Sequence, residues 1–217
     1  MNTRTHRFYA IGIVAVFAWA VAGCSTPGRN SATKAADAVT ALQQRMTTGE
    51  QQMDSTVTTL VDLVNQRQGD LRPQYQKFRD SVDKLEAQVK KGRSERAAVT
   101  TQADAYFAKW EQDTKTLQNE DIRQVAASRR ETVKASFDKI NGEFNAAKPV
   151  FESLMRDLGE IKQALDFDLT PGGTTAMKPV VAKVQGKAAT VKTHIATIRA
   201  ELGHVSAELA ATASTSQ

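Results

Sequence analysis

Apolar residues recur in alternating steps of four and three along most of this chain, and this spacing is its strongest structural signal. The clearest run extends from Leu71 to Leu117, and similar runs extend from Val133 to Leu165 and from Met177 to Leu209. A weaker run, from Val39 to Val64, contains one slipped step. A 3.5-residue repeat places apolar side chains on one stripe of an α-helix, which is typical of coiled-coil packing. The spacing therefore predicts four long helices.

Short polar segments separate these runs. "QGDLRP" contains Gly69 as a helix stop, Asp70 as a candidate N-cap and Pro73, which a first helical turn tolerates. In "LQNEDIR", Asn119 is expected to cap the next helix, and the apolar repeat slips there by a step of five, from Leu117 to Ile122. "DLTPGGTT" is typical of a turn.

Links this short make consecutive helices antiparallel neighbours. The predicted fold class is therefore all-α, an elongated antiparallel four-helix bundle whose middle helices are about 70 Å long at 1.5 Å per residue. The alternative is a longer coiled coil that completes its core by oligomerising, and the oligomeric state stays open.

The N-terminus has the three parts of a secretory signal: Arg4 and Arg7 without acids, the apolar run "FYAIGIVAVFAWAVAG", and small residues before Cys24. The run is short for a spanning helix, which needs about 20 apolar residues. The stretch from Val21 to Cys24 resembles the lipobox of bacterial lipoproteins. This resemblance implies cleavage before Cys24, a diacylglyceryl thioether on its sulfur and acylation of the new amine. The alternative is an incidental Cys beside an ordinary cleavage site.

These features predict a signal peptide over residues 1–23, a lipidated tether over 24–34, a helical bundle over 35–211 and a flexible tail over 212–217. The acyl chains at Cys24 would anchor the protein to a membrane. By analogy with enterobacterial sorting, Ser25 after the Cys indicates the outer membrane, with the protein facing the periplasm.

Composition narrows the function classes. Cys24 is the only cysteine, so no thiol remains for a disulfide or a thiolate metal site. Of 29 basic residues against 24 acidic ones, Arg4 and Arg7 lie in the expected signal, so the mature part has a net charge of +3. This bias is too weak and dispersed to indicate a nucleic-acid partner. With 6% aromatic residues and five prolines, a β-sandwich or an α/β enzyme is disfavoured.

The segments "YFAKWEQD", "NEDIRQVAASRR", "AAKPVFESLMRDL" and "LDFDLT" resemble an uncharacterised family of Gram-negative coiled-coil lipoproteins. That family is known as a domain of unknown function, number twenty-nine fifty-nine. The resemblance covers most of the mature chain and implies long helices and an envelope location. It implies no catalytic or binding residues.

No catalytic, cofactor or metal site is expected. Ser/His/Asp and Cys/His arrangements and a glycine-rich phosphate loop are missing from the sequence. His194 and His204 would lie about 15 Å apart along one helix, too far to share a metal ion. Glu201 and His204 match the Glu-x-x-His spacing of di-metal bundles, but a single copy does not make a site.

Candidate partner-binding residues lie around "YFAKWE". If the second and third helices pair about a turn near Asn119, Trp110 lies opposite Arg129, and a cation–π contact with core filling is expected. The alternative is an aromatic patch of Phe107 and Trp110 exposed for an envelope protein partner. The basic stretch "KKGRSER" is expected to be a solvated helix face, with contact to anionic lipid or cell-wall polymer as the alternative.

Folding the runs about their turns brings Gly49, Gly92, Ala147 and Ala188 to one level, beside Pro149. Small side chains there and a proline kink predict a narrow waist or bend at mid-bundle. The alternative is close helix approach without movement.

The leading functional hypothesis is a non-enzymatic, lipid-anchored envelope module that acts as a spacer, scaffold or adapter. A binding or chaperone-like module for a lipid or protein client is the second hypothesis. An enzyme is the third.

Overall fold

A computed structural model describes the backbone of residues 27–66 and 68–214 and the side chains of residues 30–66 and 68–210. Within this part of the chain every regular element is a helix. The helices are α1 (Pro27–Asn65), α2 (Arg72–Lys115), α3 (Glu120–Phe167), α4 (Pro171–Ala176) and α5 (Lys178–Ser214). The all-α class predicted from the heptad spacing is confirmed. The expected signal peptide, Cys24 and residues 215–217 lie outside the described residues.

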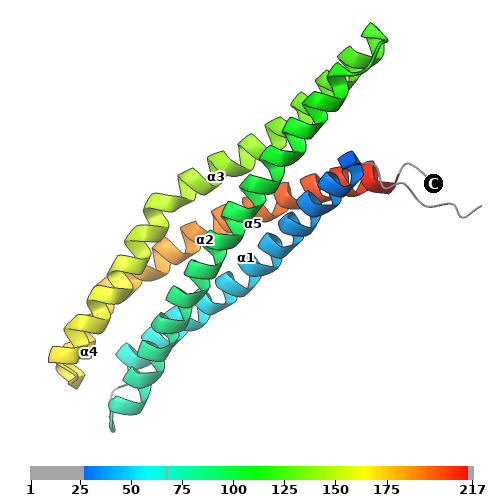
Figure 1. The fold of residues 1–217 in the computed structure, drawn as a ribbon. Coiled ribbons are helices and arrows are strands. Elements are labelled where there is room, and N and C mark those ends of the chain that lie inside the picture. Colours follow the sequence, from blue (N-terminus) through cyan, green and yellow to red (C-terminus); the bar gives the residue numbers. More distant parts are fainter. Residues whose placement is uncertain (1–26, 67, 215–217) are drawn as a thin grey trace, which may run out of the picture.

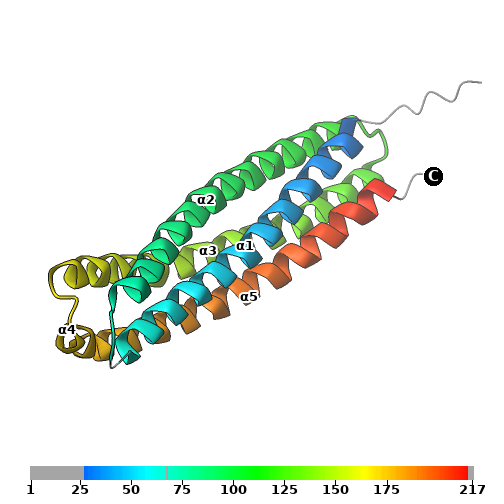
Figure 2. The same ribbon diagram turned by 90° about the horizontal axis from the view of Figure 1, so that it is seen from below.

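The four long helices form an elongated antiparallel bundle (Figure 1). α1 packs against α2 and α5, and α5 packs against α3, while the direct seam between α2 and α3 is the sparsest of the four. One end, which we call the aromatic end, holds the start of α1, the α2–α3 turn and the end of α5 (Figure 2). The other, the far end, holds the α1–α2 turn and the short α4. At the aromatic end, the α2–α3 turn projects away from the start of α1 and the end of α5 (Figure 1).

The helix starts follow local capping chemistry. The Asn119 side chain accepts a 3.1 Å hydrogen bond from the backbone N–H of Ile122, as predicted. Asp70 is not the N-cap of α2: that position belongs to Leu71, whose backbone is in the α-helical region and whose side chain is buried. The Asp70 carboxylate still accepts the backbone N–H of Arg72 at 3.0 Å, so it satisfies one free donor of the first turn.

Three expectations about the segments of the chain differ from the structure, and the first is the tail expected from residue 212, because α5 continues to Ser214. α1 begins at Pro27, eight residues before the expected start of the bundle at residue 35. Proline suits a first helical turn, and the small side chains of Ala32 and Ala35 are buried against the neighbouring helices. The "TPGGTT" segment reverses the chain as expected, but it does so through the helix α4, which Thr170 caps by accepting the N–H of Gly173.

The core consists of two separate clusters of buried side chains. The far-end cluster spans Met53–Val64, Leu71–Leu85, Leu154–Leu165 and Val181–Val191. The aromatic-end cluster spans Ala32–Leu42, Val99–Tyr106, Val133–Ile140 and Ile198–Leu209. The break between them separates two stretches of continuous apolar packing.

The structure differs from the predicted narrow waist at mid-bundle. Gly49, Gly92 and Ala147 lie between the two clusters, but Ala188 is buried inside the far-end cluster, so the expected level is wrong on α5. A Cβ at Gly49 would meet nothing within 4 Å, and one at Gly92 would meet only the Arg45 side chain at 3.7 Å, so neither glycine is required by a tight helix contact. The core is interrupted at mid-bundle, not pinched.

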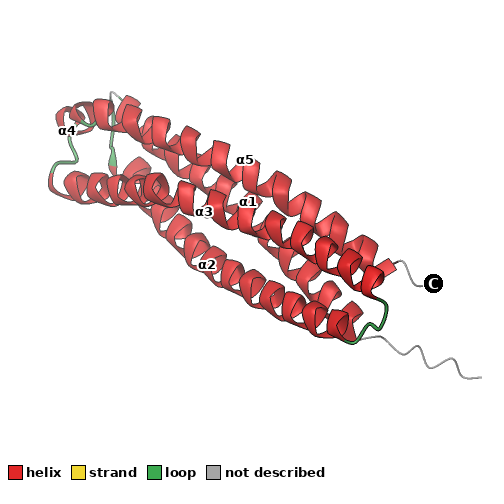
Figure 3. Ribbon diagram, turned by 90° about the horizontal axis from the view of Figure 1, so that it is seen from above, coloured by secondary structure: helices red, strands yellow, loops and turns green. Residues whose placement is uncertain are grey.

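α3 is a single 48-residue helix that contains Pro149. The ring removes the N–H that would bond to Asn145, yet the helix does not end. Its axis changes direction in its middle part, which Figure 3 shows from above. None of the described helices combines the length and the apolar character needed to cross a membrane.

Candidate functional site

Four aromatic side chains gather near the α2–α3 turn. The ring centroid of Tyr106 lies 5.4 Å from those of Phe107 and Trp110, and Phe107 meets Phe137 of α3 edge-on, also at 5.4 Å. Tyr106 and Phe137 are buried, while Phe107 and Trp110 are half-buried against the aromatic-end cluster. This tilted and edge-on packing is the favourable one for aromatic rings. Trp110 and Phe107 therefore fill the core in part, and a partner-binding role for them stays a prediction.

The predicted contact between Trp110 and Arg129 does not form among the described residues. The Arg129 guanidinium lies 3.4 Å from a carboxylate oxygen of Glu208 on α5. The next residue, Arg130, faces α2 instead and pairs with Glu111 at 2.8 Å. One residue turns a helical side chain by about 100°. The predicted alignment of α2 with α3 was correct to within one residue. The predicted orientation of Arg129 was wrong, because its side chain faces α5 and not Trp110.

A crevice of about 80 Å³ lies in the sparse seam between α2 and α3. Its apolar wall includes Val99, Phe137 and Ile140, and Asp104 and Lys134 stand at its rim. Because ligand pockets for drug-sized molecules run from about 300 Å³ upward, this crevice cannot enclose one without opening.

Arg96, the last cation of the "KKGRSER" stretch, closes one side of this crevice. Its guanidinium lies 4.5 Å from the centre of the Phe144 ring, within cation–π range. Lys90, Lys91 and Arg93 are exposed on α2, which continues unbroken through Gly92. Three of the four cations thus lie on the solvated face that the sequence predicts, and the fourth packs against α3.

Two exposed apolar side chains begin α3. Ile122 is 55% exposed and Val125 is 71% exposed, and their spacing of three residues places them on one face. We call this pair the α3 patch. The sequence-based choice of Phe107 and Trp110 missed it. The step of five from Leu117 to Ile122 was the available signal, because it takes both patch residues out of the apolar frame that continues at Val133.

The basic side chains around the α3 patch are paired, whereas Asp121, directly before Ile122, forms no ion pair among the described residues. Glu111 binds both Lys115 at 2.7 Å and Arg130 at 2.8 Å, and these hydrogen bonds lower the pKa of the Glu111 carboxyl. Arg123 pairs with Glu120 on its own helix, and Lys109 pairs with Asp113. The α3 patch is therefore bordered mostly by charges that are already paired.

His194 and His204, the two histidines among the described residues, lie in different surroundings. Nδ1 of His194 lies 3.3 Å from a Glu143 carboxylate oxygen, while His204 is exposed. Glu201, three residues before His204, pairs with Lys139 of α3. No cluster of three or more His, Cys, Asp or Glu side chains suited to a metal ion occurs within the described ranges.

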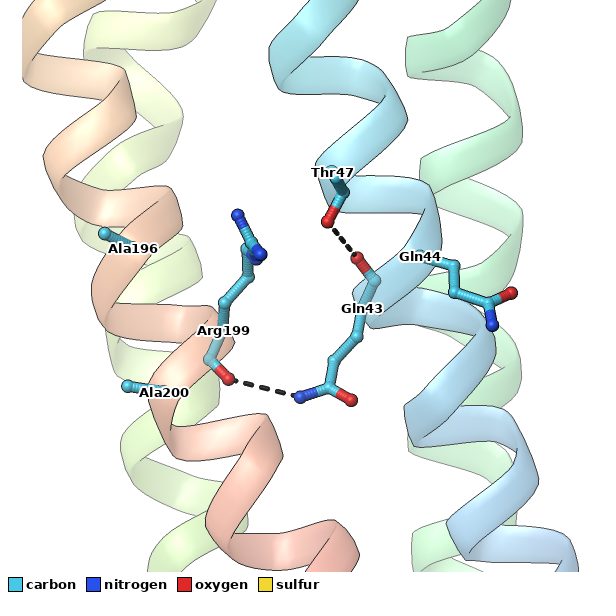
Figure 4. Close-up of a pocket in the computed structure, with 6 residues that line it drawn as sticks. All are labelled: Gln43, Gln44, Thr47, Ala196, Arg199 and Ala200. Atoms are coloured by element: carbon cyan, nitrogen blue, oxygen red, sulfur yellow. Dashed lines mark hydrogen bonds between the residues drawn. The ribbon is translucent and has the colours of Figure 1, made fainter.

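A polar depression lies between α1 and α5 near mid-bundle (Figure 4). Gln43 donates its amide N–H to the carbonyl of Arg199 at 3.2 Å, and the Thr47 hydroxyl donates to the carbonyl of Gln43 at 3.1 Å. The Arg199 guanidinium in turn pairs with Glu50 at 3.3 Å. The polar side chains of Gln43, Thr47 and Arg199 are thus bound by groups of α1 and α5, and the depression has the character of a helix–helix contact.

The observed fold is that of an elongated all-α bundle protein built around two core clusters. Residues 28–202 match the sequence profile of the family described as "protein of unknown function (DUF2959)", so the chain belongs to that family. No curated protein and no solved structure matches the chain.

Proposed function

We propose that this protein is a lipid-anchored, non-enzymatic structural module of the bacterial cell envelope. In this proposal the chain is cleaved before Cys24, the Cys24 sulfur and amine are acylated, and the protein faces the periplasm from the outer membrane. The anchor rests on the lipobox from Val21 to Cys24 and on the charged and apolar regions before it. Several acyl chains give stable membrane attachment where one would not.

One structural observation carries the proposal. α1 begins at Pro27, so only Ser25 and Thr26 separate the only thiol of the chain from the bundle. An anchor at Cys24 would therefore hold a rod directly, without a long flexible tether. α3 alone extends for about 70 Å at 1.5 Å per residue, a length that suits a spacer or an adapter between the membrane and another envelope component.

Substitution at the anchor tests this proposal. We expect Cys24→Ser to abolish metabolic labelling by a palmitate analogue and to move the protein out of the membrane fraction. Ser25→Ala, which leaves the thiol in place, is the matched control and is expected to keep both properties. Equal labelling of the Cys24→Ser variant would contradict the proposal.

A binding or chaperone-like function is the second candidate, because the α2–α3 seam is sparse and holds an apolar crevice. Separation of α2 from α3 would expose Phe137 and Ile140 to an acyl chain or an unfolded client. Native mass spectrometry of the Cys24→Ser protein tests this candidate: a co-purified lipid supports it, and a bare chain mass argues for the structural role.

A further inference from the structure

The aromatic end is the end that an anchor at Cys24 would hold. α1 begins there, and only Ser25 and Thr26 lie between Cys24 and Pro27. Three residue steps of about 3.5 Å each place the Cα atom of Pro27 no more than about 11 Å from the Cα atom of Cys24. This step rests on the lipid anchor of the proposed function.

The α2–α3 turn lies at the same end of the bundle and projects away from the start of α1 (Figures 1 and 2). α3 begins directly after this turn and carries the α3 patch, in which Ile122 is 55% exposed and Val125 is 71% exposed. Ile and Val are among the side chains most often buried in proteins, and here they share one face at the end of the bundle that an anchor would hold.

The charges near the patch do not oppose this contact. The segment from Lys109 to Glu131 contains five basic and five acidic residues. The basic ones are Lys109, Lys115, Arg123, Arg129 and Arg130, and the acidic ones are Glu111, Asp113, Glu120, Asp121 and Glu131. Each of the five basic side chains forms an ion pair with a carboxylate. The segment has no net charge, so charge alone neither draws it strongly to anionic lipid nor offers a large surface of one sign to a strongly charged protein partner.

We infer that the α2–α3 turn is a second membrane contact, in which Ile122 and Val125 enter the lipid interface beside the acyl anchor. Two apolar side chains bind a membrane weakly by themselves, but an anchor at the same end keeps them at a high local concentration. Two separated contacts fix the orientation of a rod, whereas an anchor alone leaves it free to tilt. The far end, with α4, then points away from the membrane.

The test uses the acylated protein in vesicles of phosphatidylethanolamine and phosphatidylglycerol. Acylation converts the Cys24 thiol into a thioether, so a thiol-reactive fluorophore labels only an introduced cysteine. Gln118→Cys places the label in the α2–α3 turn, and Thr175→Cys places it on exposed α4 at the far end, as the matched control. Neither position is part of the α3 patch.

Lipids with brominated acyl chains then report contact. Because interfacial side chains enter about 5–10 Å into the headgroup and acyl boundary, we expect about twofold quenching at position 118 and no quenching at position 175. Adding Ile122→Ser and Val125→Ser is expected to remove the quenching at position 118 while the protein still floats with the vesicles.

Other results would overturn the inference. Flotation without quenching at position 118 would leave the anchor intact and eliminate the second contact. Excimer formation between pyrene labels at position 118, without lipid quenching, would assign the patch to a second copy of the chain. Failure of the acylated preparation to float would overturn the inference together with the proposed anchor.

Discussion

The guanidinium of Arg96 in α2 lies 4.5 Å from the centre of the Phe144 ring in α3. This contact bridges the sparsest helix pair of the bundle and covers one side of the apolar crevice. It lies next to the break between the two core clusters, where few apolar side chains join α2 to α3.

The contribution of this contact can be measured with a double-mutant cycle. Arg96→Met keeps an unbranched apolar stem and removes the charge, and Phe144→Leu removes the ring. We expect a coupling energy of about 0.5–1 kcal/mol between the two changes in urea unfolding, the range for partly exposed cation–π pairs. Arg93→Met, on the solvated face of α2, is the control and should change the free energy of unfolding by less than about 0.5 kcal/mol. Strict additivity of Arg96→Met and Phe144→Leu would show that the contact contributes nothing.

Two apolar residues of α3 should respond differently to truncation. Leu154 is fully buried in the far-end cluster, so Leu154→Ala should lower the free energy of unfolding by about 2–5 kcal/mol through lost burial and a cavity. Ile122 is 55% exposed, and Ile122→Ala should lower it by less than about 0.5 kcal/mol. Equal destabilisation in chemical denaturation would mean that Ile122 belongs to the core.

The heptad frames predicted the helices and most of the core because burial follows the same 3.5-residue period. Leu85, Leu158 and Val191 lie in these frames and are buried. The early start of α1 was not predictable from the polar composition of "STPGRNSAT". It depends on the space that neighbouring helices leave for Ala32 and Ala35.

The candidate site was harder to predict. The sequence indicated the α2–α3 turn and the aromatic residues before it, but the choice between Arg129 and Arg130 depends on helix rotation, which an apolar repeat does not fix to one residue. The exposure of Ile122 and Val125 depends on how far the α2–α3 turn projects from α1 and α5, a tertiary feature with only an indirect sequence signal.

The break at mid-bundle predicts a local minimum of stability. Backbone amides of α3 next to Pro149 should exchange with deuterium faster than those around Ile140 and Leu158, because they lie between the clusters and Pro149 cannot donate to Asn145. Pro149→Ala should slow exchange there, since the missing backbone hydrogen bond can form. Uniform exchange along α3 would contradict the division of the core.

The Tyr75 hydroxyl should give the bundle a specific alkaline sensitivity. It lies 2.6 Å from a carboxylate oxygen of Asp166 and 2.8 Å from the carbonyl of Lys162. Burial, followed by the hydrogen bond to Asp166, raises the pKa of Tyr75 well above its ordinary value near 10. Because the pKa of Tyr75 is higher in the folded state than in the unfolded state, its protonated hydroxyl stabilises the fold fully below about pH 10. This stabilisation is lost as the pH rises toward the folded-state pKa.

Urea unfolding at several values above pH 8 can test this. The free energy of unfolding of the native protein should fall more steeply above pH 10 than that of Tyr75→Phe, which has no phenol to ionise. Parallel curves for the two proteins would show that Tyr75 ionises equally in the folded and unfolded states.

The anchor at Cys24 is the central claim of this account, and the intact mass of the protein purified from membranes of its native host tests it most directly. We predict a chain that lacks residues 1–23 and begins at Cys24, with added mass equal to a diacylglyceryl group and an N-terminal acyl chain. A chain that retains Met1, or one with an unmodified thiol at Cys24, would contradict the claim.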